Sequence, residues 1–433
     1  MTSLINVPRR FTARFLAIGL VALFTFYISL SLAEDDLSGL PLAQIEVEGN
    51  IKTQTRWVLK WANISVGDTV DQSKLNQAKQ NIFDTELFKE VILRTELRQS
   101  KPTLIIKLEE KIYTLLLPRF NRNGDGDLKL GINLKLFNIN GTDQTLNLLA
   151  EKSELNNGDD GRRYRFSYDL PKYDRPYQYH IGFSDSVTNK LKSGFRNVEF
   201  ESSASFSMTR DWHIGLLSSP LSLTTLVLYQ SIQLQSPYPD ALAELDAGKF
   251  SRLGFKIEHD AIHTEKYRRY GYFHSLEIQQ GFESLGSDYS SSIIKVESRF
   301  YHLLNQRDNF NTRLLFGWAK NSPFNVPYYE LGGSDTLRGL EQGSIIGDTL
   351  LLGNFEYVKG FESYPSFRWS SFIDVGNAYP DLADVDLGDL QTSIGFGGRW
   401  KISSFVKTDL FLDCAYNIDT DNSKIYAGTS LTF

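Results

Sequence analysis

One arginine and two carboxylates are the residues of this chain best suited to form a specific charged site. Arg338 stands in residues 331–340, Glu356 in residues 354–357 and Asp374 in residues 372–376. The glycines of this constellation are Gly332, Gly333, Gly339 and Gly376. A guanidinium offers several donors in a fixed fork, so one loop arginine can pair with two carboxylates. The predicted chemistry is electrostatic anchoring of a loop.

Two alternating strands must position the carboxylates. Successive side chains of a strand point to opposite faces. In the first strand, Glu356 therefore shares a face with Asn354. In the second strand, Asp374 shares a face with Arg368. If these strands are neighbours, both carboxylates line the same wall. The alternative is that Arg338 is a solvated loop charge, and sequence spacing alone favours this alternative.

Motifs for catalysis or metal binding do not stand out. The sequence holds no G-x-S-x-G, Walker, H-E-x-x-H or C-x-x-C pattern. His259 and His263 are four residues apart but are expected at a strand end and turn, not on a helix. Residues 121–127 are similar to the start of a calcium-binding loop, but Ile132 occupies the position where such a loop needs a bidentate glutamate. An external hairpin tip is therefore predicted at residues 121–127. We predict no metal and no cofactor.

Residues 111–433 consist of short segments with period-2 alternation, separated by Gly, Asn, Asp and Pro. One apolar face is expected to carry Val406, Leu410, Leu412, Cys414 and Tyr416. About 320 residues at roughly 20 per strand and connection give close to sixteen strands, which is too many for one soluble sandwich. The fold predicted is mainly β, a 16-stranded antiparallel transmembrane β-barrel with apolar faces on lipid and charged residues in a wet lumen.

Strand direction fixes where the loops lie. If the first strand runs outward, odd connections are external, and the longest one, about residues 321–348, is the sixth external loop. The last strand is predicted over residues 424–433. Its lipid-facing side chains are expected to be Ile425, Ala427, Thr429, Leu431 and Phe433. Cys414 is expected to face lipid as a small hydrophobe without a redox role.

Residues 42–110 are predicted to form a small β-α-α-β-β domain in front of the barrel. The first helix is expected to include Ile64 and to end near Gly67, and Asp71 is predicted to be the N-cap of the second. The last two strands are expected to meet in a turn at residues 100–102. A domain of this size with helices on one sheet face can bury an adequate core.

Residues 1–33 are predicted to be a secretory signal peptide. Arg9, Arg10 and Arg14 precede an apolar run over residues 15–30, and Ser31-Leu32-Ala33 supplies a small-x-small cleavage site. The alternative is an uncleaved membrane anchor, for which the run is slightly short. Because the chain has one cysteine, no internal disulfide is expected. The net charge of −6 argues against a nucleic-acid partner.

The order and spacing of these motifs resemble the BamA/TamA-type superfamily of outer-membrane assembly and translocation barrels, the bacterial surface antigen family. The motifs are Gly332-Gly333, Leu337-Arg338-Gly339, Asn354-x-Glu356, Phe372-x-Asp374-x-Gly376 and the terminal Leu431-Thr432-Phe433. The amino-terminal unit resembles the POTRA domain of that superfamily. The likeness covers nearly all of the chain after the predicted signal peptide.

This resemblance implies roles for single residues. In the family, an Arg-Gly-aromatic loop motif tucks into the barrel and its arginine meets inward acidic residues of strands twelve and thirteen, which here are Arg338, Glu356 and Asp374. Leu340 stands in place of the usual aromatic residue, and one POTRA unit is fewer than the best-known members carry. The resemblance also implies a C-terminal assembly signal, which here would include Gly428, Leu431 and Phe433.

The expected function is non-enzymatic assembly or translocation of polypeptides at the bacterial outer membrane, with the POTRA domain in the periplasm. Expected partners are outer-membrane lipid, an unfolded or extended polypeptide, and periplasmic or outer-membrane proteins that the POTRA domain binds. The alternative is a passive pore or structural barrel with a partner-binding periplasmic domain. A third class, an exported soluble lectin or hydrolase, requires that the mature protein stay soluble without detergent.

Overall fold

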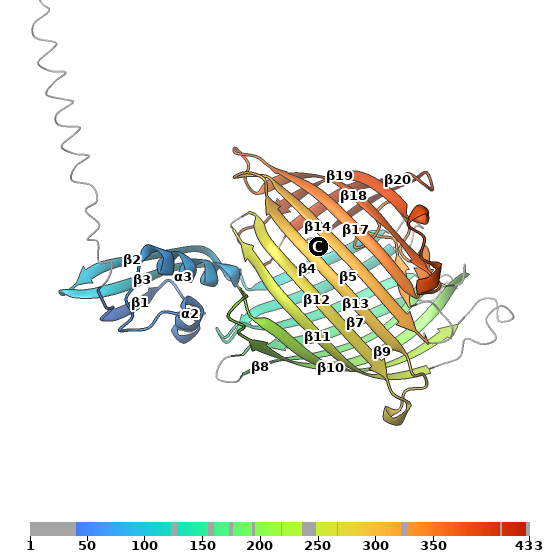
Figure 1. The fold of residues 1–433 in the computed structure, drawn as a ribbon, viewed down its shortest axis with the longest axis horizontal. Coiled ribbons are helices and arrows are strands. Elements are labelled where there is room, and N and C mark those ends of the chain that lie inside the picture. The colour runs from blue at the N-terminus through green and yellow to red at the C-terminus, as the bar shows by residue number, and fades with distance from the viewer. Residues whose placement is uncertain are drawn as a thin grey trace, which may run out of the picture.

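The structure, a computed structural model, contains a small N-terminal domain followed by a large barrel (Figure 1). It describes residues 40–122, 128–154, 160–172, 176–192, 195–217, 219–235, 248–265, 267–321, 328–407 and 409–429. The predicted signal peptide at residues 1–33, most of the calcium-like segment, and Leu431 and Phe433 lie outside the described residues.

The N-terminal domain has the expected β-α-α-β-β order. Its elements are β1 (Gln44–Glu48), α2 (Thr55–Ala62), α3 (Gln72–Asp84), β2 (Phe88–Arg98) and β3 (Lys101–Glu110). The sheet order is β1-β3-β2, with β1 parallel and β2 antiparallel to the central β3. The edge strands of this sheet are therefore β1 and β2.

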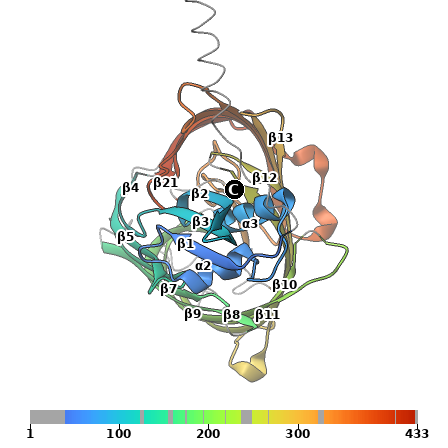
Figure 2. The ribbon, with the colours of Figure 1, turned by 90° about the vertical axis from the view of Figure 1, so that its left-hand side faces the viewer.

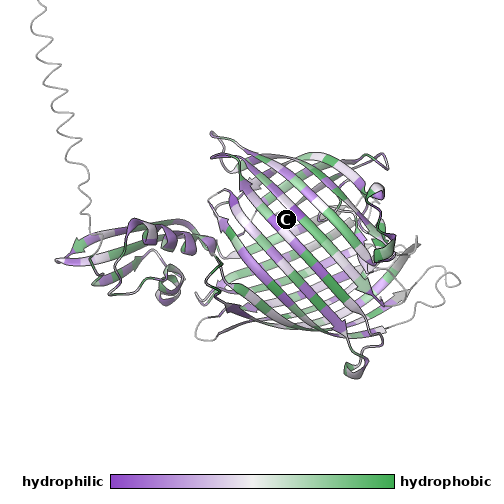
Figure 3. Cartoon of the chain, in the orientation of Figure 1, coloured by the Kyte–Doolittle hydropathy of each residue, from purple (hydrophilic) through white to green (hydrophobic). Residues whose placement is uncertain are grey.

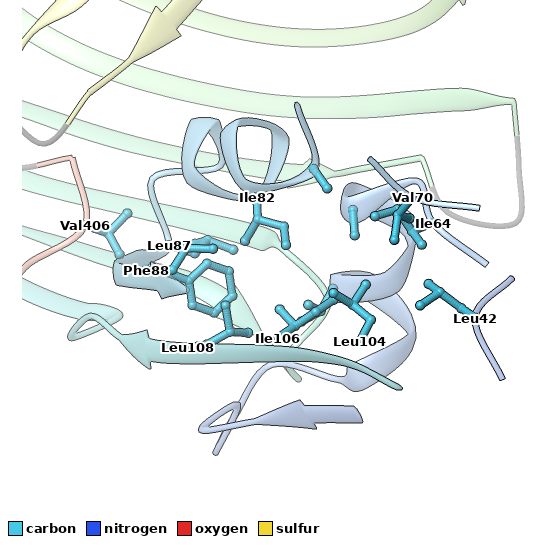
Figure 4. Packing of buried hydrophobic residues seen from close by; sticks show 14 of the residues in the cluster. Leu42, Ile64, Val70, Ile82, Leu87, Phe88, Leu104, Ile106, Leu108 and Val406 are labelled. Atoms are coloured by element: carbon cyan, nitrogen blue, oxygen red, sulfur yellow. The ribbon is translucent and has the colours of Figure 1, made fainter. Parts of the chain in front are cut away.

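The two helices pack on one face of that sheet and enclose an apolar core. Ile82 of α3 and Leu104 and Ile106 of β3 are fully buried there (Figure 4). The side chain of Asp71 accepts a hydrogen bond from Lys74 N at 2.7 Å, as expected of the N-cap of α3. Neither α-helix in the described part of the chain has the length and hydrophobicity that a membrane-spanning helix needs.

Two boundaries in this domain differ from the prediction. Helix α2 ends at Ala62, because Asn63 adopts a left-handed φ of 51° and closes the helix, so Ile64 follows the helix but is still buried. The turn between β2 and β3 is formed by Gln99 and Ser100, both at positive φ (52° and 61°), which is the geometry of a two-residue hairpin turn.

The barrel sheet has sixteen strands. They are β4 (Thr114–Arg122), β5 (Leu128–Ile139), β6 (Gln144–Glu154), β7 (Asp160–Leu170), β8 (Tyr177–Lys192), β9 (Phe195–Trp212), β10 (Leu221–Gln235), β11 (Gly248–Thr264), β12 (Arg269–Gly281), β13 (Ser292–Leu303), β14 (Asn309–Lys320), β17 (Thr349–Gly360), β18 (Phe367–Tyr379), β19 (Gln391–Lys401), β20 (Asp409–Asn417) and β21 (Asn422–Thr429). Their order in the sheet follows the chain from β4 to β21, and each neighbouring pair is antiparallel.

The sheet bends round into a barrel, and the N-terminal domain lies across one end of it (Figure 2). With the barrel strands counted from β4 as the first, the connections at the opposite end follow the first, third, fifth and each later odd strand. The long segment between β14 and β17 is the sixth of these, as predicted. It contains a short hairpin of β15 (Tyr329–Leu331) and β16 (Ile345–Gly347).

Hydrophobic and hydrophilic residues are interspersed along the barrel strands (Figure 3). In β5, Leu130 and Ile132 are 49% and 55% exposed, whereas Asn133 is buried. Cys414 shows the same outward parity, because it pairs with Phe396 and Ile425, which are 51% and 73% exposed. An outward apolar band and an inward polar face are what a bilayer requires of a barrel wall.

Two predictions for side chains near the N-terminal domain are wrong. Val406 does not face lipid: β20 begins only at Asp409, and the preceding turn brings Val406 into the core of the N-terminal domain, where it is 1% exposed (Figure 4). The turn predicted for the two histidines is also wrong: His263 is the penultimate residue of β11, at a strand end as predicted, and His259 lies further inside the same strand. His263 Nδ1 lies 3.0 Å from Asp84 Oδ2 of α3, so this histidine joins the domain to the barrel.

Candidate functional site in the barrel lumen

The sixth loop folds back against the inner wall of the barrel. Leu331 and Leu337 of the loop are fully buried and pack with inward side chains of the wall, including Leu315 of β14 and Leu350 of β17. The ring of Tyr329 lies against Gly317, where an added Cβ would be 2.5 Å from a ring carbon. The loop is therefore a packed part of the lumen.

Glycines permit the tight backbone of this loop. Gly332 has a φ of +112°, and a Cβ there would lie 1.8 Å from Glu341 O. Gly339 has a φ of +95°, and a Cβ there would lie 2.9 Å from Asn417 N of β20. A side chain at either position would meet both a left-handed backbone and a neighbouring main chain. Gly333 follows at a φ of +93°.

Arg338, at the tip of this loop, pairs with Asp374 of β18 on the lumen side of the barrel wall. Arg338 Nε donates to Asp374 Oδ2 at 2.7 Å and Nη2 donates to Oδ1 at 2.8 Å, a bidentate pair. Both side chains are 0% exposed. The guanidinium also lies over the ring of Phe372, 3.3 Å from its centroid. The structure thus contradicts the interpretation of Arg338 as a solvated loop charge.

Three further side chains extend this pair into a network. Arg338 Nη1 donates to Asp413 Oδ2 of β20 at 3.1 Å. Arg399 of β19 donates to Asp413 and, at 2.5 Å, to Glu356 Oε1 of β17. Glu356 itself lies 4.0 Å from Arg338, at the limit of an ion pair. All five side chains are buried, so solvent compensates their charges only weakly and the ion pairs within the network are the main stabilising contacts.

The loop is also bonded to the last strand of the barrel. Tyr426 of β21 donates its hydroxyl to Leu340 O at 2.9 Å and accepts from Gly339 N at 3.1 Å. Leu340 itself is buried in the apolar cluster of the loop. The aromatic contact of the arginine is thus supplied by Phe372 of the wall, although Leu340 replaces the usual loop aromatic.

The two predicted carboxylates differ in how closely they contact Arg338. Asp374 is the direct partner of Arg338, whereas Glu356 is reached mainly through Arg399. Asp413 and Arg399 were not predicted as members of the site. Strand parity alone would have placed both inward, because their outward neighbours Leu412 and Trp400 are 54% and 55% exposed. Of the other predicted residues, Gly376 lies in β18, and Gly428 lies in β21 beside the ring of Phe411.

The arrangement can hold a loop in place. Its carboxylates accept hydrogen bonds from two guanidinium groups and from Asn354, whose Nδ2 donates to Asp374 Oδ1 at 2.9 Å. Among the residues that the structure describes, no three His, Cys, Asp or Glu side chains are grouped so as to hold a metal ion. The site as described is thus an ion-pair anchor between the sixth loop and strands β17 to β20.

Relatives of known structure share this fold. BamA from Haemophilus ducreyi lacking POTRA domains 1–3 matches with a TM-score of 0.55 at 14% identity, covering 90% of this chain and 84% of that one. CdiB from Escherichia coli matches with a TM-score of 0.62 at 15% identity (89% and 75% covered), and CdiB from Acinetobacter baumannii with 0.59 at 16% identity (90% and 73% covered).

A curated relative is similar in sequence. The outer membrane protein assembly factor BamA of Nitratidesulfovibrio vulgaris is 22% identical over 382 residues, which is 83% of this chain and 46% of the relative. The chain thus spans about half the length of that relative.

Two family models match along the chain. The model described as surface antigen variable number repeat, POTRA, matches residues 41–111, and the model described as Omp85 superfamily domain matches residues 138–430. Together with the sixteen-stranded barrel, these matches place the barrel in the outer membrane and the POTRA domain in the periplasm. The chain belongs to the Omp85 superfamily.

Proposed function

We propose that this protein handles polypeptides at the outer membrane without enzymatic chemistry, either inserting other barrel proteins or moving a substrate across. The observation that carries the proposal is the buried Arg338 anchor, which binds the sixth loop to Asp374 and Asp413 while Tyr426 binds it to the last strand. A loop that grips the C-terminal strands is in a position to control the seam between β21 and β4, the two end strands of the barrel sheet.

The POTRA domain offers a docking edge for an extended segment. Its edge strand β2 spans 11 residues and pairs on one side with β3. Ile92 and Leu97 of β2 are 40% and 47% exposed. A long edge strand with exposed apolar side chains suits the addition of a further strand through main-chain hydrogen bonds. The same mode of binding would serve a substrate at an opened β4/β21 seam.

The energy for this work would come from the substrate. The sequence holds no nucleotide-binding motif, so the proposed driving force is the folding of the substrate and the burial of its apolar surface. The loop anchor supplies no energy. It sets which conformation of the C-terminal strands is populated.

Photocrosslinking in cells tests the docking step. A photoreactive residue at Ile92, on the β2 edge, is expected to capture polypeptides of many sizes. The same residue at Lys79, which is exposed but lies on helix α3 and not on a strand, is the matched control. Equal capture at both positions contradicts docking at the edge. Capture of one discrete protein at Ile92 would instead support the alternative, a passive barrel whose POTRA domain binds a partner.

A further inference from the structure

A cavity of about 50 Å³ lies in the lumen next to the POTRA domain. Glu356 and Arg399 of the Arg338 network form part of its lining, but Arg338 and Asp374 do not. The residues that line it include Arg368 of β18, Lys401 of β19 and Arg268 from the turn between β11 and β12. That turn connects strands at the periplasmic end of the barrel. The cavity therefore lies where a molecule arriving from the periplasm would first meet the barrel interior.

Basic side chains outnumber acidic ones around this cavity. The basic residues that line it are Arg268, Arg269, Arg368, Arg399 and Lys401, and the acidic residues are Glu356 and Asp409. Most of the cations have carboxylate partners. Arg268 donates to Glu265, and Arg399 donates to Glu356. Arg269 and Lys401 share Glu86 of the POTRA domain at 3.7 and 3.6 Å.

Arg368 is the exception. Its guanidinium donates to neutral acceptors, Tyr267 O at 3.0 Å and Asn309 Oδ1 at 2.7 Å. A third neutral acceptor, Arg307 O, lies 3.5 Å from Nη2. The Nε of Arg368 is buried without a hydrogen-bond partner, and no ion pair of Arg368 with a carboxylate is found among the described residues. Glu356 and Asp409 line the same cavity, but neither is within ion-pair distance of Arg368, so its charge is less directly compensated than that of the other cations.

The size and donors of the cavity select the compensating group. Its volume accommodates a few water molecules or one small anion. Water can satisfy Nε but brings no negative charge, whereas a carboxylate or phosphate matches the planar fork of the guanidinium. We propose that this cavity is a subsite for a single oxoanion group, a carboxylate or a phosphate, held by Arg368 with Arg269 and Lys401 beside it. With respect to a substrate carboxylate, this rests on the proposed polypeptide-handling function.

Inorganic phosphate is the direct probe of the subsite. The full chain in detergent is titrated with phosphate at constant ionic strength, with chloride as the balancing ion, and binding is measured as broadening of the phosphorus-31 resonance. We expect Arg368→Gln to weaken phosphate binding by about tenfold or more, the effect of losing a charged hydrogen-bond donor. Arg368→Lys keeps the charge without the fork and is expected to give an intermediate loss.

Arg163→Gln is the matched control, because Arg163 is a β7 residue that pairs with Glu151 and does not line the cavity. It is expected to bind phosphate as the unchanged protein does. Phosphate binding that is equal in the unchanged chain, Arg368→Gln and Arg368→Lys would overturn the proposal. Lack of any phosphate binding by the unchanged chain would overturn it equally.

A competition arm identifies the source of the anion. An extended peptide with aspartate side chains and a free C-terminal carboxylate is compared with the same peptide carrying amides at those positions. Displacement of phosphate only by the carboxylate peptide supports a role in binding polypeptide substrates. Displacement by neither peptide refutes that role and leaves a subsite for free oxoanions. Because the phosphate titration needs no substrate, its failure would leave the polypeptide-handling function standing.

Discussion

Replacing Arg338 by alanine is expected to release the sixth loop from the lumen while the barrel wall still assembles. The change removes the bidentate pair with Asp374, the bond to Asp413 at 3.1 Å and the contact with Phe372. It removes none of the strand pairings that build the wall. The loss should therefore be concentrated in the loop.

The magnitude follows from burial. An exposed ion pair contributes about 0–1 kcal/mol, whereas breaking a buried one costs about 3–5 kcal/mol because the partner charge is left uncompensated. Since Arg338 and Asp374 are both 0% exposed, we expect the cost of breaking their pair to lie in the range for buried pairs, about 3–5 kcal/mol. The network has two guanidinium groups and three carboxylates, so Arg338→Ala raises the uncompensated negative charge. Asp374→Asn lowers the uncompensated negative charge of the network and should therefore destabilise the loop less than Arg338→Ala does.

Hydrogen exchange of the loop amides measures this cost. For residues 328–348, Arg338→Ala should speed exchange by about a hundredfold or more, the equivalent of about 3 kcal/mol. Arg163→Ala, which removes a lumen arginine of β7 that is 29% exposed, should leave the loop amides unchanged. The double variant Arg338→Ala with Asp374→Ala should cost less than the sum of the single changes. Additive costs, or unchanged exchange in Arg338→Ala, would refute the buried anchor.

Three smaller predictions follow from the same structure. Gly339→Ala should make the loop sensitive to protease, because its φ of +95° and its close contact with β20 exclude a Cβ, whereas Gly215→Ala, with open space around it, should not. Cys414 should resist a thiol reagent confined to water when the protein is in membranes, while Leu216→Cys, at a position 95% exposed, should react; ready labelling of Cys414 would mean that β20 is inside out. Burial raises the pKa of Asp143, in the turn between β5 and β6, to about 6, so its charged form is disfavoured in the fold. Asp143→Asn should then stabilise the protein at pH 7.5 by at most about 3 kcal/mol in urea unfolding, and the gain should disappear as the pH falls through about 6 towards 4.

Period-2 alternation was enough to predict the barrel wall from the sequence. The side of each strand that faces lipid is fixed by parity, and for this reason the inward positions of Glu356 and Asp374 and the outward position of Cys414 followed without a structure. The strand number followed from length, because barrel strands and their connections have a narrow range of lengths. Helix spacing and the Asp71 cap likewise predicted the order of elements in the N-terminal domain, although not the end of α2.

Sequence patterns could not predict contacts between segments that are distant in the chain. Val406 has the apolar character of a lipid-facing residue, and only the turn before β20 shows that it completes the core of the POTRA domain. Asp413 and Arg399 had the correct parity, but no spacing rule tells which inward charges share one height in the lumen. Helix α2 ends at Ala62 because Asn63 has a left-handed φ. The sequence did not predict this end, because Ile64 continues the helical spacing of apolar residues.

The rate at which liposomes convert an added unfolded barrel protein or extended polypeptide into a protease-resistant form tests the proposed function most directly. Liposomes containing the full chain, and those containing Arg163→Ala, should produce the resistant form faster than empty liposomes. Liposomes containing Arg338→Ala should produce it at close to the empty-liposome rate, although the barrel is inserted. If the full chain gives no more resistant substrate than empty liposomes while it conducts ions, the protein is a passive pore and the polypeptide-handling function is wrong.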